Sequence, residues 1–241
     1  MQFEMVQLGR AILYRADCLD VMPLLQPVNH IITDPPYEQI MHAAKANGRK
    51  LRQDRGPELK ALGFNSIDYI RAAVVNHASS LCAGWFIAFC TPEGVSKWAD
   101  AINASPMKYK RACAWVKPDA APQMNGQGPA AGFENFVCAW GGGGFSKWNA
   151  GGKRGVYTHY TNPPERDGRH PTEKPRRLMS EIVADFTMPG DIILDPFMGS
   201  GSTGVATVMA HRDFIGIESD PEVFAWAVER IENAQRQMSL I

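Results

Sequence analysis

The fold is decided by the stretch Asp191-Ile-Ile-Leu-Asp-Pro-Phe-Met-Gly-Ser-Gly-Ser-Thr-Gly204, in which consecutive apolar residues lead into a glycine-rich turn. This pattern predicts a buried strand, a tight turn and the start of a helix. Gly199 and Gly201 allow positive φ and a close approach of a ligand to the backbone. Asp195 stands at the end of the strand, where its carboxylate would repel a pyrophosphate. The turn therefore favours a positively charged ligand, with an ordinary strand–helix turn and a dinucleotide site as alternatives.

The next strand downstream, predicted at Phe214–Ile217, ends at Glu218. This acidic residue lies about 20 residues beyond the turn, the offset of a nucleoside-binding β–α–β unit. Its carboxylate could accept hydrogen bonds from both ribose hydroxyls. The carboxylate of Asp195 suits the amino group and the sulfonium of S-adenosyl-L-methionine, because both are positively charged. We therefore expect S-adenosyl-L-methionine as the cofactor.

Elsewhere in the chain, short apolar runs alternate with helical patterns, which predicts an α/β fold with a mainly parallel sheet covered by helices. The other strands are expected at Ala11–Arg15, His30–Thr33, Trp85–Cys90, Arg111–Val116, Phe136–Trp140 and Ile192–Leu194. The helices are expected at Ile67–Leu81, Glu93–Ala104, Arg176–Phe186, Gly201–Met209 and Pro221–Gln237. The length suits one domain over residues 1–241.

Composition narrows the class of protein further. Lys and Arg together number 25, as do Asp and Glu, so a nucleic-acid binder with this zero net charge would need a local basic surface. The five cysteines form no CxxC pair and have no metal-ligand spacing, which indicates a reducing compartment and no metal. We see neither a signal peptide nor the roughly 20 apolar residues that span a bilayer. A cytoplasmic or nucleoid-associated protein is expected.

A second motif, Asp34-Pro35-Pro36-Tyr37, directly follows the predicted strand His30–Thr33. Its prolines stiffen the chain and orient the Asp34 side chain and the Pro35 carbonyl. Two fixed acceptors could grip the hydrogens of an exocyclic base amine and localise its lone pair for attack on a methyl group. Tyr37 could stack on that base, which would first have to leave the duplex. An ordinary turn with a packed tyrosine is the alternative.

Together the two motifs resemble those of the DNA amino-methyltransferases, which carry a D/N/S-PP-Y/F/W tetrapeptide and an F-x-G-x-G turn, here Phe197–Gly201. Because the tetrapeptide comes first, the order resembles the permuted β class of that family. His170–Pro175 is similar to the family's H-P-T-x-K-P segment. Arg15–Leu19 resembles its G-D-C-L element, with Ala16 in place of glycine.

The resemblance implies a doubly wound, seven-stranded, mostly parallel sheet of the Rossmann-like methyltransferase type, with one antiparallel strand. It implies methyl transfer to the N6 amine of a flipped-out adenine in double-stranded DNA, since aspartate at the first tetrapeptide position favours adenine in the family. N4 of cytosine is the alternative, followed by an RNA or protein-glutamine methyltransferase and by a catalytically silent DNA-binding module. The catalytic residues would be Asp34, Pro35, Pro36 and Tyr37. The cofactor would be bound by Asp17, Cys18, Asp34, His170, Thr172, Lys174, Asp195, Pro196, Phe197, Gly199, Ser200, Gly201, Thr203, Glu218 and Ser219.

Two irregular stretches offer the basic surface that DNA needs. A DNA-facing loop is expected at about 38–66, and a target-recognition insertion, which the permuted class carries before the cofactor-bordering helix, at about 141–169. The expected nucleic-acid contacts are Lys45, Arg49, Lys50, Arg52, Arg55, Lys153, Arg154 and Arg169. The second loop is short, which predicts a brief recognition sequence or relaxed specificity. Solvated surface loops are the plainer interpretation, and a homodimer and a separate restriction endonuclease stay open as partners.

Overall fold

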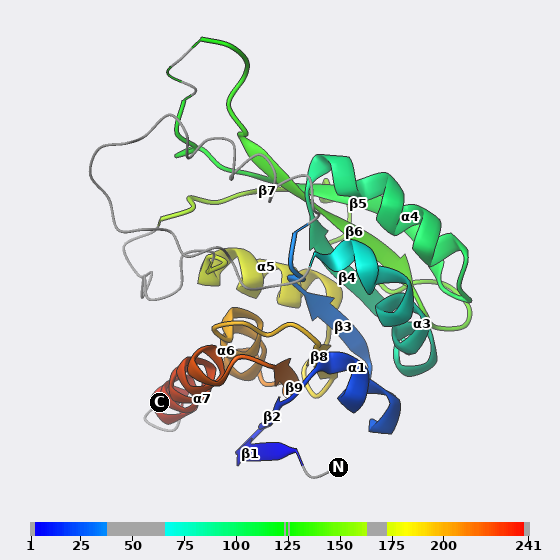
Figure 1. Cartoon of the computed structure of the whole chain (residues 1–241), viewed down its shortest axis with the longest axis vertical. Coiled ribbons are helices and arrows are strands. Elements are labelled where there is room, and N and C mark those ends of the chain that lie inside the picture. The colour runs from blue at the N-terminus through cyan, green and yellow to red at the C-terminus, as the bar shows by residue number, and fades with distance from the viewer. Residues whose placement is uncertain (1–2, 38–65, 123, 125, 163–172, 239–241) are drawn as a thin grey trace.

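The computed structural model describes residues 3–37, 66–122, 124, 126–162 and 173–238. Its strands form one sheet in the order β1-β2-β9-β8-β3-β4-β6-β5-β7 (Figure 1). The strands are β1 Glu4–Leu8, β2 Ala11–Arg15, β3 His30–Thr33, β4 Trp85–Cys90, β5 Lys108–Val116, β6 Phe133–Trp140, β7 Val156–Thr158, β8 Ile192–Asp195 and β9 Asp213–Glu218. The α-helices are α1 Cys18–Val21, α3 Arg71–Leu81, α4 Val95–Asn103, α5 Arg176–Phe186, α6 Ser202–Met209 and α7 Pro221–Met238. Single 3₁₀ turns lie at η1 Met22–Leu24, η3 Ile67–Tyr69 and η4 Pro92–Gly94.

Helices cover both faces of the sheet, with α1, α3 and α4 on one side and α5, α6 and α7 on the other (Figure 1). Strand β4 shows why the central strands read as unbroken apolar runs. Trp85, Ile87 and Phe89 pack toward α5, whereas the alternate residues, among them Phe86 and Ala88, pack toward α3 and α4. Because both faces of the strand are buried, its sequence shows no polar alternation. No described helix is both long and apolar enough to cross a membrane.

The predicted α/β class and the mainly parallel sheet are confirmed, but the predicted number of strands was wrong. Within the described residues the sheet has nine strands, and two of them, β1 and β6, run antiparallel to their neighbours. The inner seven strands, from β2 to β5 in sheet order, contain one antiparallel strand, as expected. The two additional strands lie at the edges: β1 has no fully buried residue and β7 has three residues. Edge strands of this kind leave little hydrophobic pattern in the sequence.

The predicted elements differ from the observed ones mainly at their ends. Four strands begin or end one to three residues outside the predicted bounds, as in β6, which begins at Phe133 instead of Phe136. The predicted helix Ile67–Leu81 is divided into η3 and α3. The short helix α1 was not predicted, although Asp17 caps it by accepting a hydrogen bond from the amide of Leu19 at 2.8 Å.

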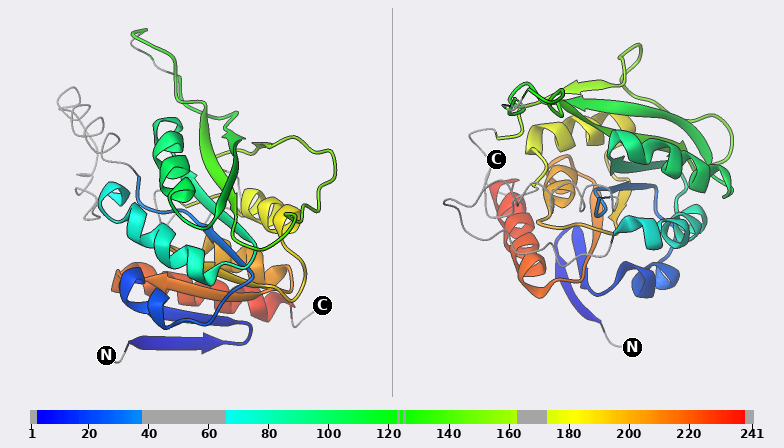
Figure 2. Two further views of the ribbon diagram at one scale, coloured as in Figure 1. Left: turned by 90° about the vertical axis from the view of Figure 1, so that its right-hand side faces the viewer. Right: turned by 45° about the horizontal axis from the view of Figure 1, so that its top comes forward.

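All strands except β1 and β6 run in one direction, so their carboxyl ends meet at one edge, here called the carboxyl edge. Because β6 runs the other way, its first residues lie at this edge, and the loop between β5 and β6 extends beyond it as a long arm (Figures 1 and 2). The chain proceeds from β8 to β9 on one side and from β3 to β4 on the other. The β3–β8 junction is therefore a topological switch point, where open α/β sheets bind ligands.

Candidate active site

The two sequence motifs meet at the switch point, because β3 and β8 are neighbours. Thr33 ends β3 and donates a hydrogen bond of 2.6 Å from Oγ1 to Oδ1 of Asp195, and the amide of Phe197 donates to the same oxygen at 3.0 Å. Asp195 is 1% exposed. Burial raises the pKa of its carboxyl to about 7, against the opposing effect of hydrogen bonds from Thr33 and Thr203. The nearby charge of Asp34 raises it further.

The glycine-rich turn adopts the backbone conformation that its sequence predicts. Gly199 and Gly201 have φ of +51° and +83°, where other residues are strained. The amide of Gly199 donates to Oε2 of Glu218 at 3.1 Å, and the amide of Asp220 donates to Oε1 at 2.8 Å. A Cβ added at Gly199 would meet nothing closer than the Phe197 carbonyl oxygen at 4.0 Å. The turn therefore borders open space, with the Glu218 carboxylate fixed beside it.

The residues around the turn fit the predicted nucleoside cofactor. The amide of Ala16 donates to the carbonyl of Glu218 at 3.1 Å, which places the Asp17 loop beside that carboxylate. Asp17 is exposed, whereas Cys18 is buried and burial raises the pKa of its thiol to about 12. The hydroxyl of Ser202 at the start of α6 is buried and has no hydrogen-bond partner among the described residues. Acceptors, open space and an orphaned hydroxyl thus gather at one end of the sheet.

Some predicted cofactor residues are engaged by the protein itself. Ser200 accepts a hydrogen bond of 2.9 Å at Oγ from Arg230 on α7, and Arg230 also binds Glu173 at 2.6 Å. Pro196 and Thr203 are buried beneath the turn, and Ser219 is exposed beyond β9. These residues shape the turn, and the buried carboxylate of Asp195 is likewise bonded to Thr33 and Phe197. The carboxylate of Glu218 lies beside the open space at Gly199.

Lys174 connects the tetrapeptide to the segment before α5. Its side chain is 4% exposed, and its Nζ lies 2.7 Å from Oδ2 of Asp34 and 3.3 Å from the hydroxyl of Tyr37. The rings of Phe89, Tyr37 and Trp115 surround the ammonium, with centroids at 5.0, 5.4 and 5.9 Å. Sequence reasoning placed Lys174 among the cofactor residues, and in the structure it contacts the Asp34–Tyr37 tetrapeptide.

The other carboxylate oxygen of Asp34, Oδ1, is buried and accepts no hydrogen bond from any described residue. Burial raises the pKa of Asp34, while Lys174 opposes this shift and the negative charge of Glu134 adds to it. Burial alone would lower the pKa of Lys174, but Asp34, Tyr37 and Glu134 raise it well above its usual value. Lys174 therefore stays charged and holds one oxygen of Asp34, and the other oxygen is left as an acceptor.

Sequence reasoning missed Glu134, the second residue of β6. Its Oε1 accepts a hydrogen bond of 3.1 Å from the hydroxyl of Tyr37 and is paired with Nζ of Lys117, and its Oε2 lies 3.4 Å from Nζ of Lys174. A glutamate next to Asn135, directly before an apolar run, was the available signal, but β6 was predicted to begin two residues after it. We call this group the catalytic cluster: Asp34, Tyr37, Lys117, Glu134 and Lys174.

The predicted target-recognition insertion divides into two parts. Strand β6 ends at Trp140, at the edge opposite the carboxyl edge, so the segment 141–155 begins far from the catalytic cluster. It packs along α5, where the amide of Asn149 donates to the carbonyl of Asp185 at 3.0 Å. Strand β7 then returns the chain to the carboxyl edge, where the amide of His159 donates to the carbonyl of Val116 at 3.2 Å. Among the described residues of the insertion, those after β7, numbers 159–162, lie at the carboxyl edge.

Lys153, a predicted DNA contact, is paired with carboxylates of α5. Its Nζ lies 2.6 Å from Oε1 of Glu181 and also contacts Asp185, which accepts a hydrogen bond of 2.8 Å from the hydroxyl of Tyr157. The α5 cluster is Lys153, Tyr157, His159, Glu181 and Asp185. Its pairing balances the charge of Lys153, whereas Arg154 is exposed. The predicted residues that lie outside the described residues are Lys45, Arg49, Lys50, Arg52, Arg55, Arg169, His170 and Thr172.

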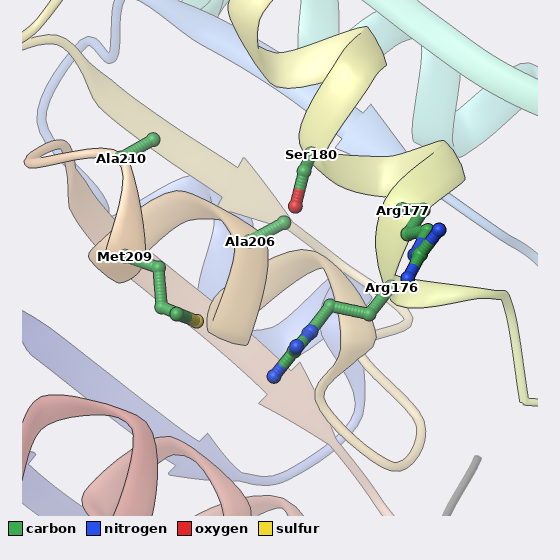
Figure 3. A pocket seen from close by; sticks show the side chains of 6 residues that line it. All are labelled: Arg176, Arg177, Ser180, Ala206, Met209 and Ala210. Carbon is green, nitrogen blue, oxygen red and sulfur yellow. The ribbon is translucent and has the colours of Figure 1, made fainter. Parts of the chain in front are cut away.

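Figure 3 shows an open depression on the outer surface between α5 and α6. Its lining residues are Arg176, Arg177, Ser180, Ala206, Met209 and Ala210. Arg176 extends over α6, and both arginines are exposed. None of the lining residues belongs to the tetrapeptide or the glycine turn, so the depression adds basic surface beside the site and forms no part of it.

Comparison with known proteins gives an independent view of the chain. A family model described as DNA methylase matches residues 28–229. The putative methylase YubD of Escherichia coli (strain K12) is 27% identical over 245 residues, which cover 93% of this chain and 91% of YubD. The DNA adenine methyltransferase YhdJ of the same organism is 43% identical over 65 residues, 27% of this chain and 22% of YhdJ. The Type II methyltransferase M2.MboI of Moraxella bovis is 53% identical over 55 residues, 23% of this chain and only 20% of M2.MboI.

Solved structures share the fold over most of the chain. The M1.HpyAVI–SAM complex matches with a TM-score of 0.70 at 28% identity, over 91% of this chain and 98% of that one. The PvuII DNA methyltransferase, described as cytosine-N4-specific, matches with a TM-score of 0.69 over 98% of this chain and 96% of that one. Its identity of 14% supports a shared fold alone. The predicted Rossmann-like methyltransferase fold is confirmed.

Proposed function

The chain belongs to the DNA methylase family of N6- and N4-methyltransferases, and on this premise we propose that it methylates the N6 amine of a flipped-out adenine in duplex DNA. The observation that carries the proposal is the state of Asp34. One of its oxygens is held by Lys174 at 2.7 Å, and the other is a buried acceptor with no described donor. A buried acceptor of this kind is costly unless a ligand satisfies it.

S-adenosyl-L-methionine is the cofactor, and it supplies a methyl group bonded to a positively charged sulfur. Asp195 and Glu218 would hold it, because their carboxylates flank the turn that borders open space. Glu218 would accept from the ribose hydroxyls through lone pairs that the amides of Gly199 and Asp220 leave free. The carboxylate of Asp195 would face positive charge.

The tetrapeptide would prepare the base amine for attack. Oδ1 of Asp34 and the carbonyl of Pro35 would each accept one amine hydrogen, which localises the nitrogen lone pair and fixes its direction. The nitrogen loses a proton when it gains the methyl group, and we assign that proton to Oδ1 of Asp34. The raised pKa of Asp34 suits this role, because a more basic carboxylate accepts a proton more readily. The ring of Tyr37 would stack on the flipped base.

Two observations support adenine over cytosine as the target base. The first tetrapeptide residue is Asp34, and the matching segment of 65 residues in YhdJ belongs to a protein described as a DNA adenine methyltransferase. Methylation of cytosine N4 is the alternative, since the PvuII enzyme, described as cytosine-N4-specific, has the same fold.

The experiment is incubation of the purified protein with S-adenosylmethionine and DNA that carries no modified bases. The DNA is then digested to nucleosides, which are identified by mass spectrometry. We expect N6-methyladenosine in its deoxy form. N4-methyldeoxycytidine in its place would contradict the base assignment, and methylation of RNA but not of DNA would contradict the substrate class.

A further inference from the structure

Glu134 contacts every other side chain of the catalytic cluster except Asp34. Its Oε1 binds the hydroxyl of Tyr37 and the ammonium of Lys117, and its Oε2 lies 3.4 Å from the ammonium of Lys174. We propose that Glu134 is a positioning residue for methyl transfer, which acts through Tyr37 on the stacking ring and through Lys174 on the free oxygen of Asp34. The inference rests on the proposed function and adds to it a residue that lies outside both sequence motifs.

The first part of the argument concerns Tyr37. Its hydroxyl donates to Glu134 at 3.1 Å and lies 3.3 Å from Nζ of Lys174. Burial raises the pKa of the tyrosine, so the phenol keeps its proton and remains a donor at any working pH. A ring held at its hydroxyl by a residue of β6 cannot swing about the Cα–Cβ bond, so the ring is kept at one place, where a base can stack on it. Without Glu134, the hydroxyl would lose the acceptor of its proton, and Lys174 cannot replace that acceptor because an ammonium is itself a donor.

The second part of the argument concerns Lys174, whose ammonium is shared by Asp34 and Glu134. Its ammonium lies between Oδ2 of Asp34 at 2.7 Å and Oε2 of Glu134 at 3.4 Å. Glu134 competes with Asp34 for the ammonium, so Lys174 is held between the two carboxylates, and Oδ1 of Asp34, the acceptor that the base needs, has no described donor. Lys117 supplies the second positive charge, so the two carboxylates and two lysines balance. Burial acts to raise the pKa of Glu134, but Lys174 and Lys117 outweigh it and hold the pKa below its usual value.

The fold does not need the Glu134 side chain to form the β5–β6 hairpin. Backbone hydrogen bonds pair these strands from Lys108 to Val116, and the amide of Lys117 donates to the carbonyl of Gly132 at 2.9 Å. The carboxylate of Glu134 pairs with Lys117 at the end of β5, and it also contacts Tyr37 after β3 and Lys174 before α5. An ion pair with Lys117 would be enough to balance a charge in the hairpin, so the contacts with Tyr37 and Lys174 are the ones that a purely structural role leaves unexplained.

The test compares Glu134→Gln with Lys117→Gln through the acid limb of the kcat/KM profile on unmodified DNA. The charged or titratable groups that face Asp34 are Lys174, Glu134, Lys117, Tyr37 and Asp195. Glu134 raises the pKa of Asp34 and Lys117 lowers it. We therefore expect Glu134→Gln to shift the acid limb to lower pH and Lys117→Gln to shift it to higher pH. Shifts in the same direction, or none, would overturn the inference.

A second readout separates positioning from folding. Glutamine at position 134 keeps an acceptor for Tyr37 and alanine does not, so Glu134→Ala should lower kcat at least tenfold more than Glu134→Gln. It should also reduce the fluorescence change of 2-aminopurine placed at the target base. Glu232→Gln on α7, an exposed pair with Arg236, is the matched control and should behave as the wild type. Equal kcat for the alanine and glutamine variants, at equal thermal stability, would overturn the inference.

The failures of the two proposals are distinguishable. If the wild-type protein methylates no base in DNA, the proposed function fails and this inference fails with it. If the wild type methylates adenine and Glu134→Gln keeps the wild-type pH profile, only the role of Glu134 fails. Should Glu134→Ala not fold, the nearly isosteric Glu134→Gln and the opposite shift of Lys117→Gln still decide the question.

Discussion

The catalytic cluster and the α5 cluster are built from the same parts, a lysine between two carboxylates beside a tyrosine ring. Lys174 is 4% exposed and Lys153 is 28% exposed. In the α5 cluster both carboxylates stand on one helix, and no buried side-chain oxygen described there lacks a hydrogen-bond partner. In the catalytic cluster the carboxylates come from the residue after β3 and from β6, and neither Oδ1 of Asp34 nor Oε2 of Glu134 has a hydrogen-bond partner among the described residues. Ion pairing by itself therefore does not distinguish the two clusters, whereas the buried carboxylate oxygens without a hydrogen-bond partner do.

The largest effect that separates the two clusters is expected from Asp34→Ala. Removal of the acceptor should lower kcat by about 10³-fold, the upper part of the range for loss of one group that stabilises a transition state. The affinity for S-adenosylmethionine, measured by calorimetry, should stay within a few-fold of the wild type. Asp185→Ala in the α5 cluster is the matched control and should keep most of the activity. More than a tenth of wild-type turnover in Asp34→Ala would contradict the catalytic role.

Stability should also distinguish the two lysines. Lys174→Met leaves the buried carboxylates of Asp34 and Glu134 without their shared cation, and breaking such a pair costs about 3–5 kcal/mol. Lys153→Met removes a partly exposed pair and should cost about 1 kcal/mol. Urea unfolding at pH 7 measures both free energies. Equal losses of unfolding free energy in the two variants would contradict the claim that the greater burial of Lys174 makes its ion pairs more important for stability.

A substitution in the predicted cofactor site should change the affinity for S-adenosylmethionine, which Asp34→Ala should leave nearly unchanged. Glu218→Ala removes an acceptor for the ribose and the partner of the Gly199 and Asp220 amides. Hydrogen bonds to charged groups contribute about 1.5–3 kcal/mol, so S-adenosylmethionine should bind about 10- to 100-fold more weakly. Glu222→Ala, an exposed residue in the first turn of α7, serves as the control. Unchanged affinity in Glu218→Ala would remove this residue from the cofactor site.

The smallest effect is a pH dependence of cofactor binding. The pKa of Asp195 is raised to about 7, so its carboxylate becomes ionised as the pH rises through that value. Because the raised pKa leaves the folded protein with more bound protons than the unfolded chain, the free protein loses stability as the pH rises from the ordinary value of 3.8 to about 7. The ionised carboxylate favours a positively charged ligand. Affinity for S-adenosylmethionine should therefore increase up to about tenfold between pH 6 and pH 8. Asp195→Asn should bind more weakly and without this dependence, and a wild type with flat affinity would contradict the account.

The sequence was sufficient for the elements that are buried on both faces or ended by proline and glycine. The strands at His30–Thr33 and Trp85–Cys90 were predicted to the residue, because apolar runs stop sharply at Asp34 and Thr91. The edge strand Glu4–Leu8 was missed because its residues are half-buried or exposed. The hydrophobic pattern of a sequence indicates which residues are buried, and an edge strand has few buried residues.

The residues of the candidate site could be predicted only where they belong to a local sequence motif. Asp34 and Glu218 stand in motifs whose spacing implies their use. Glu134 has partners 97 and 17 residues away, at Tyr37 and Lys117, and no local pattern connects them. In the sequence, Lys153 does not differ from the other basic residues that were predicted to contact DNA. Its pairing with the carboxylates of α5 arises only in the folded chain.

The most direct test of the central claim is a crystal structure of the protein with a cofactor analogue and duplex DNA that holds the target adenine. Oδ1 of Asp34 should lie within about 2.7–3.2 Å of N6 of the flipped base, while Oδ2 stays with Lys174. The ring of Tyr37 should stack on the same base, with its hydroxyl on Glu134. A flipped base whose amine binds other acceptors, with Lys174 covering both oxygens of Asp34, would contradict the account.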